Sequence, residues 1–298
     1  MEIPFKPIEL SDKKWIEELL SYSDFRGSEY TFTNNYNWSK VYELDVARYG
    51  DFIVYLMGRS ERSSYLFPAG RGDLGQVLSQ LMEDAQSRGE AFRLHGIQPN
   101  QIVLIDELFP GKFVYETNEG SSDYIYLVEK LQTLSGKKLH AKRNHINRFR
   151  QNYPDWSYEA ISSDNLDEVR EMSRQWCKEN DCEAGGSLAD EACAVKCALN
   201  NFEALELSGG FIRAGGRIVA FSFGHRISSD TFGVHVEKAF ADVQGAYTMI
   251  NQQFAIHVMD GFTYANREED MGDEGLRQAK HSYYPEFMYE RYRAKYVD

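Results

Sequence analysis

Hydrophobic residues recur along this chain in two periods, one that favours strands and one that favours helices. Residues 52–57 form an apolar run of strand length, much shorter than a membrane-spanning helix requires. In the second half, residues 210–213 and 217–223 predict a β-hairpin around the turn Ala214-Gly215-Gly216, because adjacent glycines supply the positive φ angles of a tight turn. The pattern therefore predicts a chain that mixes strands with helices.

The strand predicted after this hairpin alternates strictly between apolar and polar positions. Phe232, Val234 and Val236 are expected on one face of the sheet, and His235 and Glu237 on the other. A loop with one glycine follows, and then a helical pattern. The polar face of this strand is thus expected to lead towards a loop able to hold a ligand.

The same two periods predict the remaining elements, with an aromatic-rich loop at 30–42. In the first half the predicted strands are 5–10, 52–57, 65–68, 92–96, 112–116 and 124–128. The predicted helices are one that begins at Ser11-Asp12, one at 77–85 and one at 101–109. In the second half the predicted strands are 156–161, 210–213, 217–223, 231–237, 262–266 and 286–296, and the predicted helices are 166–176, 189–207, 245–259 and 272–281.

Both halves follow one order of elements: strand, helix, antiparallel strands, glycine-containing loop, helix, strand, helix and final strand. The repeat predicts an α/β (α+β) fold of two modules with mixed, largely antiparallel sheets. The expected boundaries are 1–130 for the first module, 131–154 for a linking helix, and 155–298 for the second module, which is expected to carry the active site.

The linking segment, residues 135–153, differs from its surroundings in charge. It contains six lysines and arginines and no acid, in a chain of net charge −13. Ser135 is a suitable N-cap and Pro154 prevents helix beyond Tyr153, so the whole segment is predicted to be helical. Such a cationic helix either bridges two domains in solvent or faces an anionic ligand. Both alternatives stay open from the sequence.

Two faces of this predicted helix differ in character. One is a polar stripe able to reach a phosphate or a carboxylate, and the other is a thin apolar line. The polar stripe consists of Lys137, His140, Asn144 and Asn147, and the apolar line of Leu139, Ile146 and Phe149.

Composition narrows the class of protein. Hydrophobic residues make up 42% of the chain, enough for sizeable cores. The N-terminus lacks a secretory signal pattern, so a cytoplasmic protein is expected. The four cysteines, at 177, 182, 193 and 197, do not follow the usual zinc-ligand spacings, and no metal is expected. Dinucleotide-binding, P-loop and G-x-S-x-G motifs do not occur.

Three loops carry candidate chemistry. Residues 242–248 place one glycine at the start of a helix, where backbone N–H groups favour a phosphate, although a glycine there also suits a plain tight turn. Residues 266–270 place an arginine and three acids after a strand, which suits proton transfer or a solvated acidic turn. Residues 280–285 offer a lysine that could anchor an anion and tyrosines that could donate a proton.

Three of these segments together resemble the family named for the C-terminal domain of phosphatidylglycerol lysyltransferase. Residues 135–147 (SGKKLHAKRNHIN) resemble its first motif, and residues 236–251 its second. Residues 266–285, from NREEDMGDEGLR to the proline after the tyrosine pair, resemble its third. The resemblance covers essentially the whole chain and implies two tandem GNAT-like modules, the second with the working site.

The resemblance implies transfer of an acyl or aminoacyl group, from an acyl-CoA (with coenzyme A as product) or an aminoacyl-tRNA, to an amine or hydroxyl acceptor. The acceptor would be a small molecule or an aminoacyl compound, and tRNA a possible partner. The rival hypothesis is a non-catalytic module that binds a small anion through the basic helix.

The resemblance also gives the candidate residues their roles. The expected catalytic residues are Glu237, Glu268, Glu269 and Tyr283: one of the acids takes the acceptor's proton, and the tyrosine protonates the leaving group. The donor's phosphates are expected at Val236, Gln244, Gly245, Ala246, Tyr247 and Thr248. The donor or an anionic acceptor is expected to meet Lys137, His140, Lys142, Arg143, Asn144, Asn147, Arg267 and Lys280.

Overall fold

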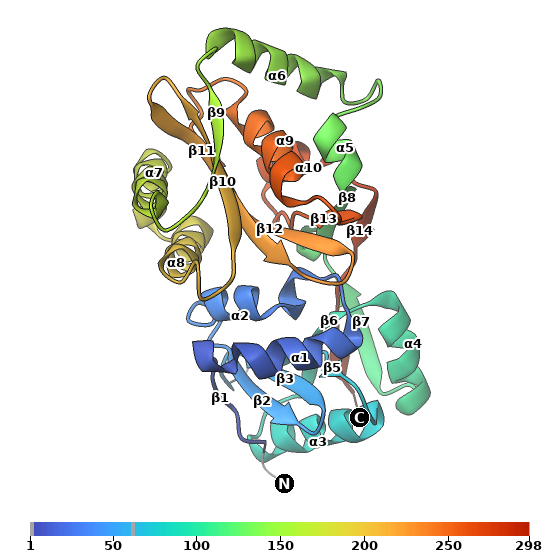
Figure 1. Ribbon diagram of the computed structural model, residues 1–298. Coiled ribbons are helices and arrows are strands. Elements are labelled where there is room, and N and C mark those ends of the chain that lie inside the picture. Colours follow the sequence, from blue (N-terminus) through green and yellow to red (C-terminus); the bar gives the residue numbers. More distant parts are fainter. Residues whose placement is uncertain (1–2, 61–62, 298) are drawn as a thin grey trace. The chain divides into compact units, whose positions relative to one another are not determined.

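The computed structural model describes residues 3–60 and 63–297 (Figure 1). The chain forms two compact units, each described here by itself. Unit 1 takes in the described residues up to Asp123, residues 269–277, and the described residues from Met288 onward. Unit 2 takes in residues 124–268 and 278–287. The backbone therefore passes between the units four times, whereas the expected boundaries at 130 and 155 imply one linking segment.

Unit 1 is built on a mixed sheet in which the last strand along the chain, β15, is an inner strand. Its strand order is β1-β2-β3-β4-β6-β15-β7, with β5 paired to β3, and β4 and β6 run parallel. The strands are β1 (Lys6–Pro7), β2 (Asp45–Tyr49), β3 (Phe52–Met57), β4 (Ser64–Leu66), β5 (Ala69–Gly70), β6 (Arg93–Ile97), β7 (Phe113–Thr117) and β15 (Tyr292–Tyr296).

The core of unit 1 lies between this sheet and its helices. Val77, Leu78 and Leu81 of one helix pack with Val54 and Leu94 of the strands, all nearly fully buried. The helices are α1 (Lys13–Ser23), α2 (Phe32–Trp38), α3 (Leu74–Ser87) and α4 (Pro99–Leu108), with 3₁₀ turns at Leu10–Asp12, Ser28–Tyr30 and Glu119–Ser121.

Unit 2 is built on a seven-stranded sheet of mostly antiparallel pairs. The strand order is β14-β8-β13-β12-β11-β10-β9, and β12 and β13 form its parallel pair. The predicted hairpin is confirmed as β10 and β11, with Gly215 and Gly216 at positive φ in the turn. The strands are β8 (Asp123–Leu127), β9 (Ser157–Ala160), β10 (Ser208–Ala214), β11 (Arg217–Arg226), β12 (Thr231–Ala239), β13 (Tyr264–Asn266) and β14 (Phe287–Tyr289).

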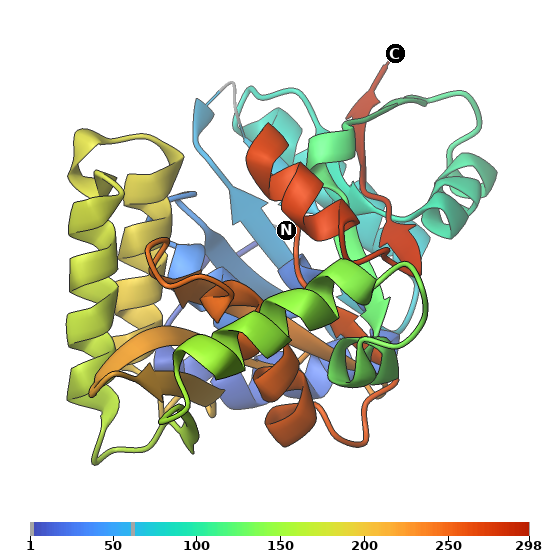
Figure 2. The same cartoon turned by 90° about the horizontal axis from the view of Figure 1, so that it is seen from above.

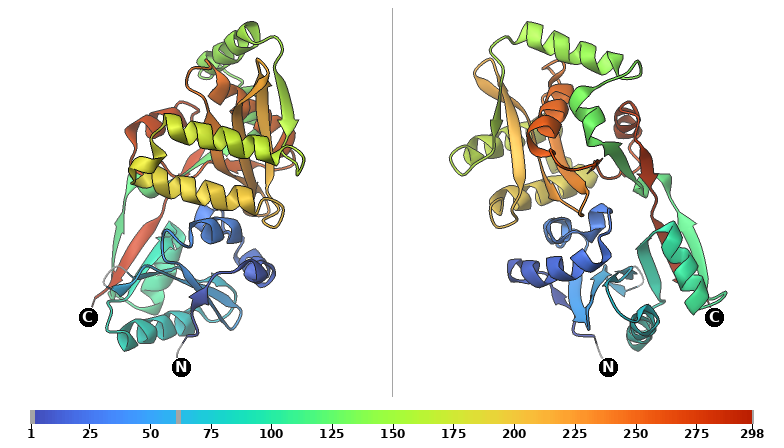
Figure 3. Two further views of the ribbon diagram at one scale, coloured as in Figure 1. Left: turned by 90° about the vertical axis from the view of Figure 1, so that its left-hand side faces the viewer. Right: turned by 45° about the vertical axis from the view of Figure 1, so that its right-hand side comes forward.

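Helices cover both faces of this sheet. In Figure 1, α7 and α8 lie on one side of β10–β12 and α9 on the other, and Figure 3 shows α7 and α8 side by side. The cationic helix α6 packs on α9 (Figure 2). The helices are α5 (Val128–Thr133), α6 (His140–Asn152), α7 (Leu166–Glu179), α8 (Ser187–Asn200), α9 (Ala246–Val258) and α10 (Glu274–His281), with a 3₁₀ turn at Cys182–Ala184.

Several predicted elements differ from the structure: the strand predicted at 5–10 is reduced to β1, the helix predicted at 189–207 ends at Asn200, and β2 and α5 were not predicted. Three further differences have a local cause. The predicted loop at 30–42 contains α2, which Thr31 caps by accepting a hydrogen bond from the Asn34 N–H at 3.1 Å. The predicted final strand is two strands in different sheets, β14 and β15, separated where Arg291 turns inward. The predicted helix from Ser135 begins at His140 instead, because Gly136 has φ +86°.

In the described part of the chain, every helix is too short or too polar to cross a bilayer.

Candidate functional site

The site forms where the two parallel strands of unit 2 stop pairing. Strands β12 and β13 pair as far as Gly233 and Asn266, and β12 then continues to Ala239 without β13. Side chains connect the two strands beyond that point. Arg267 and Glu268, which follow β13, bond to Glu237 and His235 of β12. The divergence of the two parallel strands thus creates a polar site at the carboxyl end of β13, beside β12.

A β-bulge at His235 gives this site its arrangement. Phe223 of β11 pairs with Val236, but the next residue, Gly224, pairs with Val234, so His235 is the extra residue on β12. The bulge reverses the alternation of faces. The prediction that Val234 and Val236 share a face is therefore wrong. Glu237 was predicted on the face opposite Val234, but it lies on the same face as Val234, the one that α9 covers.

Glu237 is held by two side chains that each keep one polar atom available. Asn251 of α9 donates from Nδ2 to Glu237 Oε2, and Arg267 donates from Nη2 to Oε1, both at 2.9 Å. Within the described residues, Arg267 Nη1 and Asn251 Oδ1 are buried and have no hydrogen-bond partner. Burial lowers the pKa of Arg267, but the Glu237 charge and hydrogen bond, together with Tyr126 and Tyr283, outweigh it and the net pKa is raised. One donor and one acceptor are therefore presented beside a carboxylate.

Tyr283 and Lys142 lie beside Arg267 in this site. Burial raises the pKa of Tyr283 to about 12, against smaller lowering effects of Arg267 and of Thr248 in the first turn of α9. Lys142 Nζ lies 3.9 Å from the centre of the Tyr283 ring, and Arg267 Cζ lies 4.8 Å from it. Burial, and then the charge of Arg267, lower the pKa of Lys142 to about 8. The α6 helix thus contributes one half-buried cation to the site.

The glycine-containing loop leads from β12 to the start of α9. Gly245 is the N-cap of α9 with φ +88°, and a Cβ atom there would lie 2.7 Å from the His145 carbonyl oxygen of α6. Gln244 and Tyr247 are exposed, whereas Ala246 and Thr248 are buried. Val236, also predicted to bind the donor, is buried in the sheet.

The polar stripe predicted on α6 is exposed to solvent in the structure. Lys137 precedes the helix, and His140, Asn144 and Asn147 are exposed to solvent. Arg143 donates to the Leu134 carbonyl and, at 2.7 Å, to the Gly136 carbonyl. It therefore fixes the turn before the helix. The predicted apolar line, Leu139, Ile146 and Phe149, is buried.

Two other predicted residues are engaged in structural contacts. Lys280 is buried, and its ammonium group donates to the carbonyls of Arg267 and Glu268 at 2.6 and 3.0 Å. The predicted role as an anion anchor is therefore replaced by holding the site loop. Glu269 belongs to unit 1, where it accepts a hydrogen bond from Arg291 at 2.8 Å.

Sequence reasoning missed His225 and Asn251 as site residues. His225 Nδ1 lies 2.6 Å from His235 Nε2, and His235 Nδ1 lies 2.7 Å from Glu268 Oε1. Two histidines on consecutive antiparallel strands were a signal for this contact. The register that brings them together depends on the bulge, which alternation along the sequence does not indicate.

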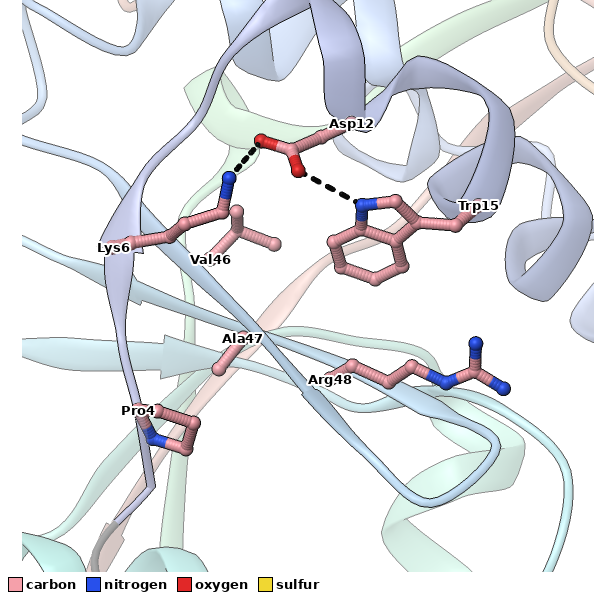
Figure 4. Close-up of a pocket in the computed structure, with 7 residues that line it drawn as sticks. All are labelled: Pro4, Lys6, Asp12, Trp15, Val46, Ala47 and Arg48. Carbon is pink, nitrogen blue, oxygen red and sulfur yellow. Dashed lines mark hydrogen bonds and ion pairs between the residues drawn. The ribbon is translucent and has the colours of Figure 1, made fainter.

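Unit 1 has a surface hollow of about 410 Å³ beside β1 and β2 (Figure 4). Asp12 there accepts hydrogen bonds from Lys6 Nζ at 2.8 Å and from Trp15 Nε1 at 2.9 Å. It also accepts one from the Glu9 N–H at 2.9 Å. These bonds close the start of α1, so the polar groups of the hollow are already engaged.

Two mixed, largely antiparallel sheets, one opened by diverging parallel strands beside a glycine-led helix, place the chain in the class of α/β proteins built from two such units, as predicted. The chain belongs to the family described as phosphatidylglycerol lysyltransferase, C-terminal, whose family model matches residues 21–295.

Solved structures share the fold. A conserved protein of unknown function from Bacteroides thetaiotaomicron is 43% identical, with a TM-score of 0.95, over 99% of this chain and 100% of that one. L-PGS from Bacillus licheniformis has the same fold, with a TM-score of 0.67 at 16% identity, over 99% of this chain and 94% of that one.

An uncharacterised protein of Mycoplasmoides gallisepticum is 29% identical over 188 residues, which are 60% of this chain. The match spans 58% of that relative's length.

Proposed function

We propose that this chain transfers an acyl or aminoacyl group from an acyl-CoA or an aminoacyl-tRNA to an amine or hydroxyl acceptor. The family supports a transferase, and one observation carries the proposal to this site. Arg267 Nη1 and Asn251 Oδ1 are buried and unpartnered within the described residues, on either side of Glu237. Buried polar atoms are normally satisfied, so this pair is suited to a ligand with both an acceptor and a donor.

The proposed chemistry is direct attack. Arg267 Nη1 donates to the carbonyl oxygen of the donor, on which negative charge develops. Glu237 and Asn251 Oδ1 accept hydrogen bonds from the amine or hydroxyl group, and the Glu237 carboxylate takes its proton as the new bond forms. The acceptor's nitrogen or oxygen forms the new bond to the carbonyl carbon, and the bond to the thiol sulfur or ribose oxygen breaks.

Tyr283 is proposed to protonate the leaving group. Its pKa of about 12, raised by burial, keeps the phenol protonated at neutral pH. Thr248, which lowers this pKa slightly, stands in the first turn of α9, where the N–H groups of a helix N-terminus favour the donor's phosphates. Lys142 adds a positive charge 3.9 Å from the centre of the Tyr283 ring.

The test has two stages. Thermal shift with CoA, acetyl-CoA, deacylated tRNA and lysyl-tRNA identifies the donor, because a ligand that binds only the native state raises Tm. Labelled donor is then incubated with free amines, free hydroxyl compounds and phosphatidylglycerol vesicles, and the label in each acceptor is counted. We expect one donor to bind and to label one acceptor class. Binding without labelling of any acceptor would instead support a non-catalytic anion-binding module.

A further inference from the structure

Lys142 on α6 has an ammonium group without a polar partner. Its side chain is half-buried, and Nζ lies 3.9 Å from the centre of the Tyr283 ring. Among the described residues, no carboxylate or carbonyl oxygen forms a hydrogen bond or an ion pair with it. Buried charges are normally paired, and Arg143, the next residue, donates to two backbone carbonyls. Lys142 therefore differs from a cation that only fixes the fold.

The groups around Lys142 favour its neutral amine. Arg267 Cζ lies 4.8 Å from the centre of the same Tyr283 ring, so a second cation stands close by. Burial, and then Arg267, lower the pKa of Lys142 to about 8, although the charge of Glu237 opposes this shift. At pH 7 about 10% of such a lysine is the neutral amine, against roughly 0.04% of an ordinary lysine. Lys142 thus has a lone pair available at neutral pH.

The position of this amine matters for the proposed reaction. A lysine becomes a nucleophile when it is desolvated or lies next to another cation, and Lys142 meets both conditions. Arg267, whose Nη1 is proposed to hold the carbonyl oxygen of the donor, lies against the same aromatic ring. The activated carbonyl group and the amine of Lys142 are therefore brought to one place, where Lys142 competes with the acceptor.

We propose that Lys142 is a self-acylation site, which takes the acyl group of an activated ester or thioester onto its own Nζ. The inference rests on the proposed function only for the source of the acyl group. The Nζ lone pair forms a bond to the carbonyl carbon, and the bond from that carbon to the thiol sulfur or ribose oxygen breaks. One proton leaves the nitrogen for the Glu237 carboxylate, and the leaving group takes a proton from Tyr283.

The modification has a consequence for the donor. The product is an amide, which has neither the positive charge of Lys142 nor its electrostatic attraction to the Tyr283 ring. An acylated chain therefore binds an anionic donor more weakly. Self-acylation is fastest when donor is bound without acceptor, because the carbonyl group then stays longest beside the amine. Lys142 in this way lowers donor binding when acceptor is scarce.

The first experiment uses a thioester that lacks phosphates. The protein is incubated with S-acetyl-N-acetylcysteamine, and peptide mass spectrometry compares Lys142 with Lys137, an exposed lysine that precedes the same helix. We expect Lys142 to be acetylated about tenfold faster at pH 8. Its rate should level off above about pH 9, whereas that of free Nα-acetyl-lysine should keep rising. Equal rates at the two lysines would overturn the inference.

The second experiment uses the donor identified above, labelled in its acyl group and supplied without acceptor. We expect label at Lys142 in the wild-type protein and none at position 142 in Lys142→Arg, because a guanidinium keeps the charge but is never deprotonated. Added acceptor should slow the labelling. A donor that labels an acceptor but never Lys142 would refute self-acylation and leave the proposed function standing. Rapid acetylation of Lys142 by the small thioester, without transfer to any acceptor, would refute only the proposed function.

Discussion

At the scale of single residues, the site combines unsatisfied polar atoms with a carboxylate. A buried polar group without a partner costs about 1–3 kcal/mol. Arg267 Nη1 and Asn251 Oδ1 both lie in this state among the described residues, within one side chain of Glu237. This cost in stability falls at the place where the proposed function requires the donor and acceptor substrates to bind. A bound substrate satisfying both atoms would gain that energy.

Lys142 gives the first prediction at this scale. Its pKa of about 8, lowered by burial and by Arg267, means that it is charged below that pH and neutral above it. Affinity for the anionic donor should therefore fall several-fold from about pH 7 to about pH 9. Lys142→Arg, which stays charged, should remove this dependence, and Lys142→Ala should weaken binding roughly tenfold at neutral pH. Titration calorimetry measures both.

Arg148→Ala is the matched control for Lys142, because it removes an exposed cation from the same helix. It should leave the donor Kd and its pH dependence within error of the wild type. Equal losses in the two variants would mean that α6 acts only through its overall charge.

Tyr283 gives the second prediction. Tyr283→Phe removes the hydroxyl proposed to protonate the leaving group and keeps the buried ring against Lys142. We expect kcat to fall about 100-fold with donor Kd unchanged, as measured by rapid-quench turnover and thermal shift. An unchanged kcat would show that the leaving group obtains its proton elsewhere.

The candidate residues were predictable to different degrees. Glu237, Arg267 and Tyr283 could be named because three motifs together resemble one family. Their meeting point could not be derived from alternation, since the bulge at His235 changes the face on which Glu237 lies. Lys280 shows the opposite case: a lysine in a polar loop suggests an anion anchor, but backbone carbonyls occupy its ammonium group.

At the scale of elements, local signals predicted strands and helices better than their sheet membership. The apolar run of β3 and the glycine turn of the β10–β11 hairpin were located from the sequence. The chain from 286 to 296 was predicted as a single strand, yet it divides between two sheets. The division depends on the strands with which β14 and β15 pair, which are distant in the chain. A local sequence pattern does not indicate those pairings.

Gly245 gives the prediction at this scale, because it lets α6 approach the start of α9. Gly245→Ala adds a Cβ at φ +88°, 2.7 Å from the His145 carbonyl oxygen. The strained φ and the clash should together lower the free energy of unfolding by about 3 kcal/mol. Urea denaturation followed by circular dichroism measures the loss.

Gly261→Ala separates the two causes. Gly261 has a similar φ of +85°, and nothing lies within 4 Å of its Cβ position. This variant should lose only about 1 kcal/mol, the cost of the left-handed conformation. Equal losses at 245 and 261 would show that α6 yields readily and does not depend on close approach.

At the scale of the whole molecule, residues next to the chain crossings share a buried cluster in unit 1. Arg291 contacts the carboxylates of Glu29 and Glu269 at 2.8 Å and that of Asp123 at 3.1 Å. One guanidinium thus faces three acids. Burial raises the pKa of Glu29 to about 7 although Arg291 opposes the shift, so Glu29 gains a proton readily within the cluster.

Glu29 gives the prediction at this scale. Its folded-state pKa of about 7 is above the usual 4.5. The native state therefore binds more protons than the unfolded state between these values, and this contribution to stability is lost as the pH rises towards 7. Glu29→Gln should flatten the decline in unfolding free energy between about pH 5 and about pH 7.5 by roughly 1 kcal/mol. An unchanged slope would assign the decline to another group.

The position of β15 has a consequence for the order of folding during synthesis. It lies between β6 and β7, so β7 has no neighbour in its sheet until residues 292–296 have been made. The N-terminal segments of unit 1 must therefore remain incomplete while the ribosome synthesises all of unit 2. A chain arrested after β14 would expose the unpaired edges of β6 and β7, which chaperones are suited to protect.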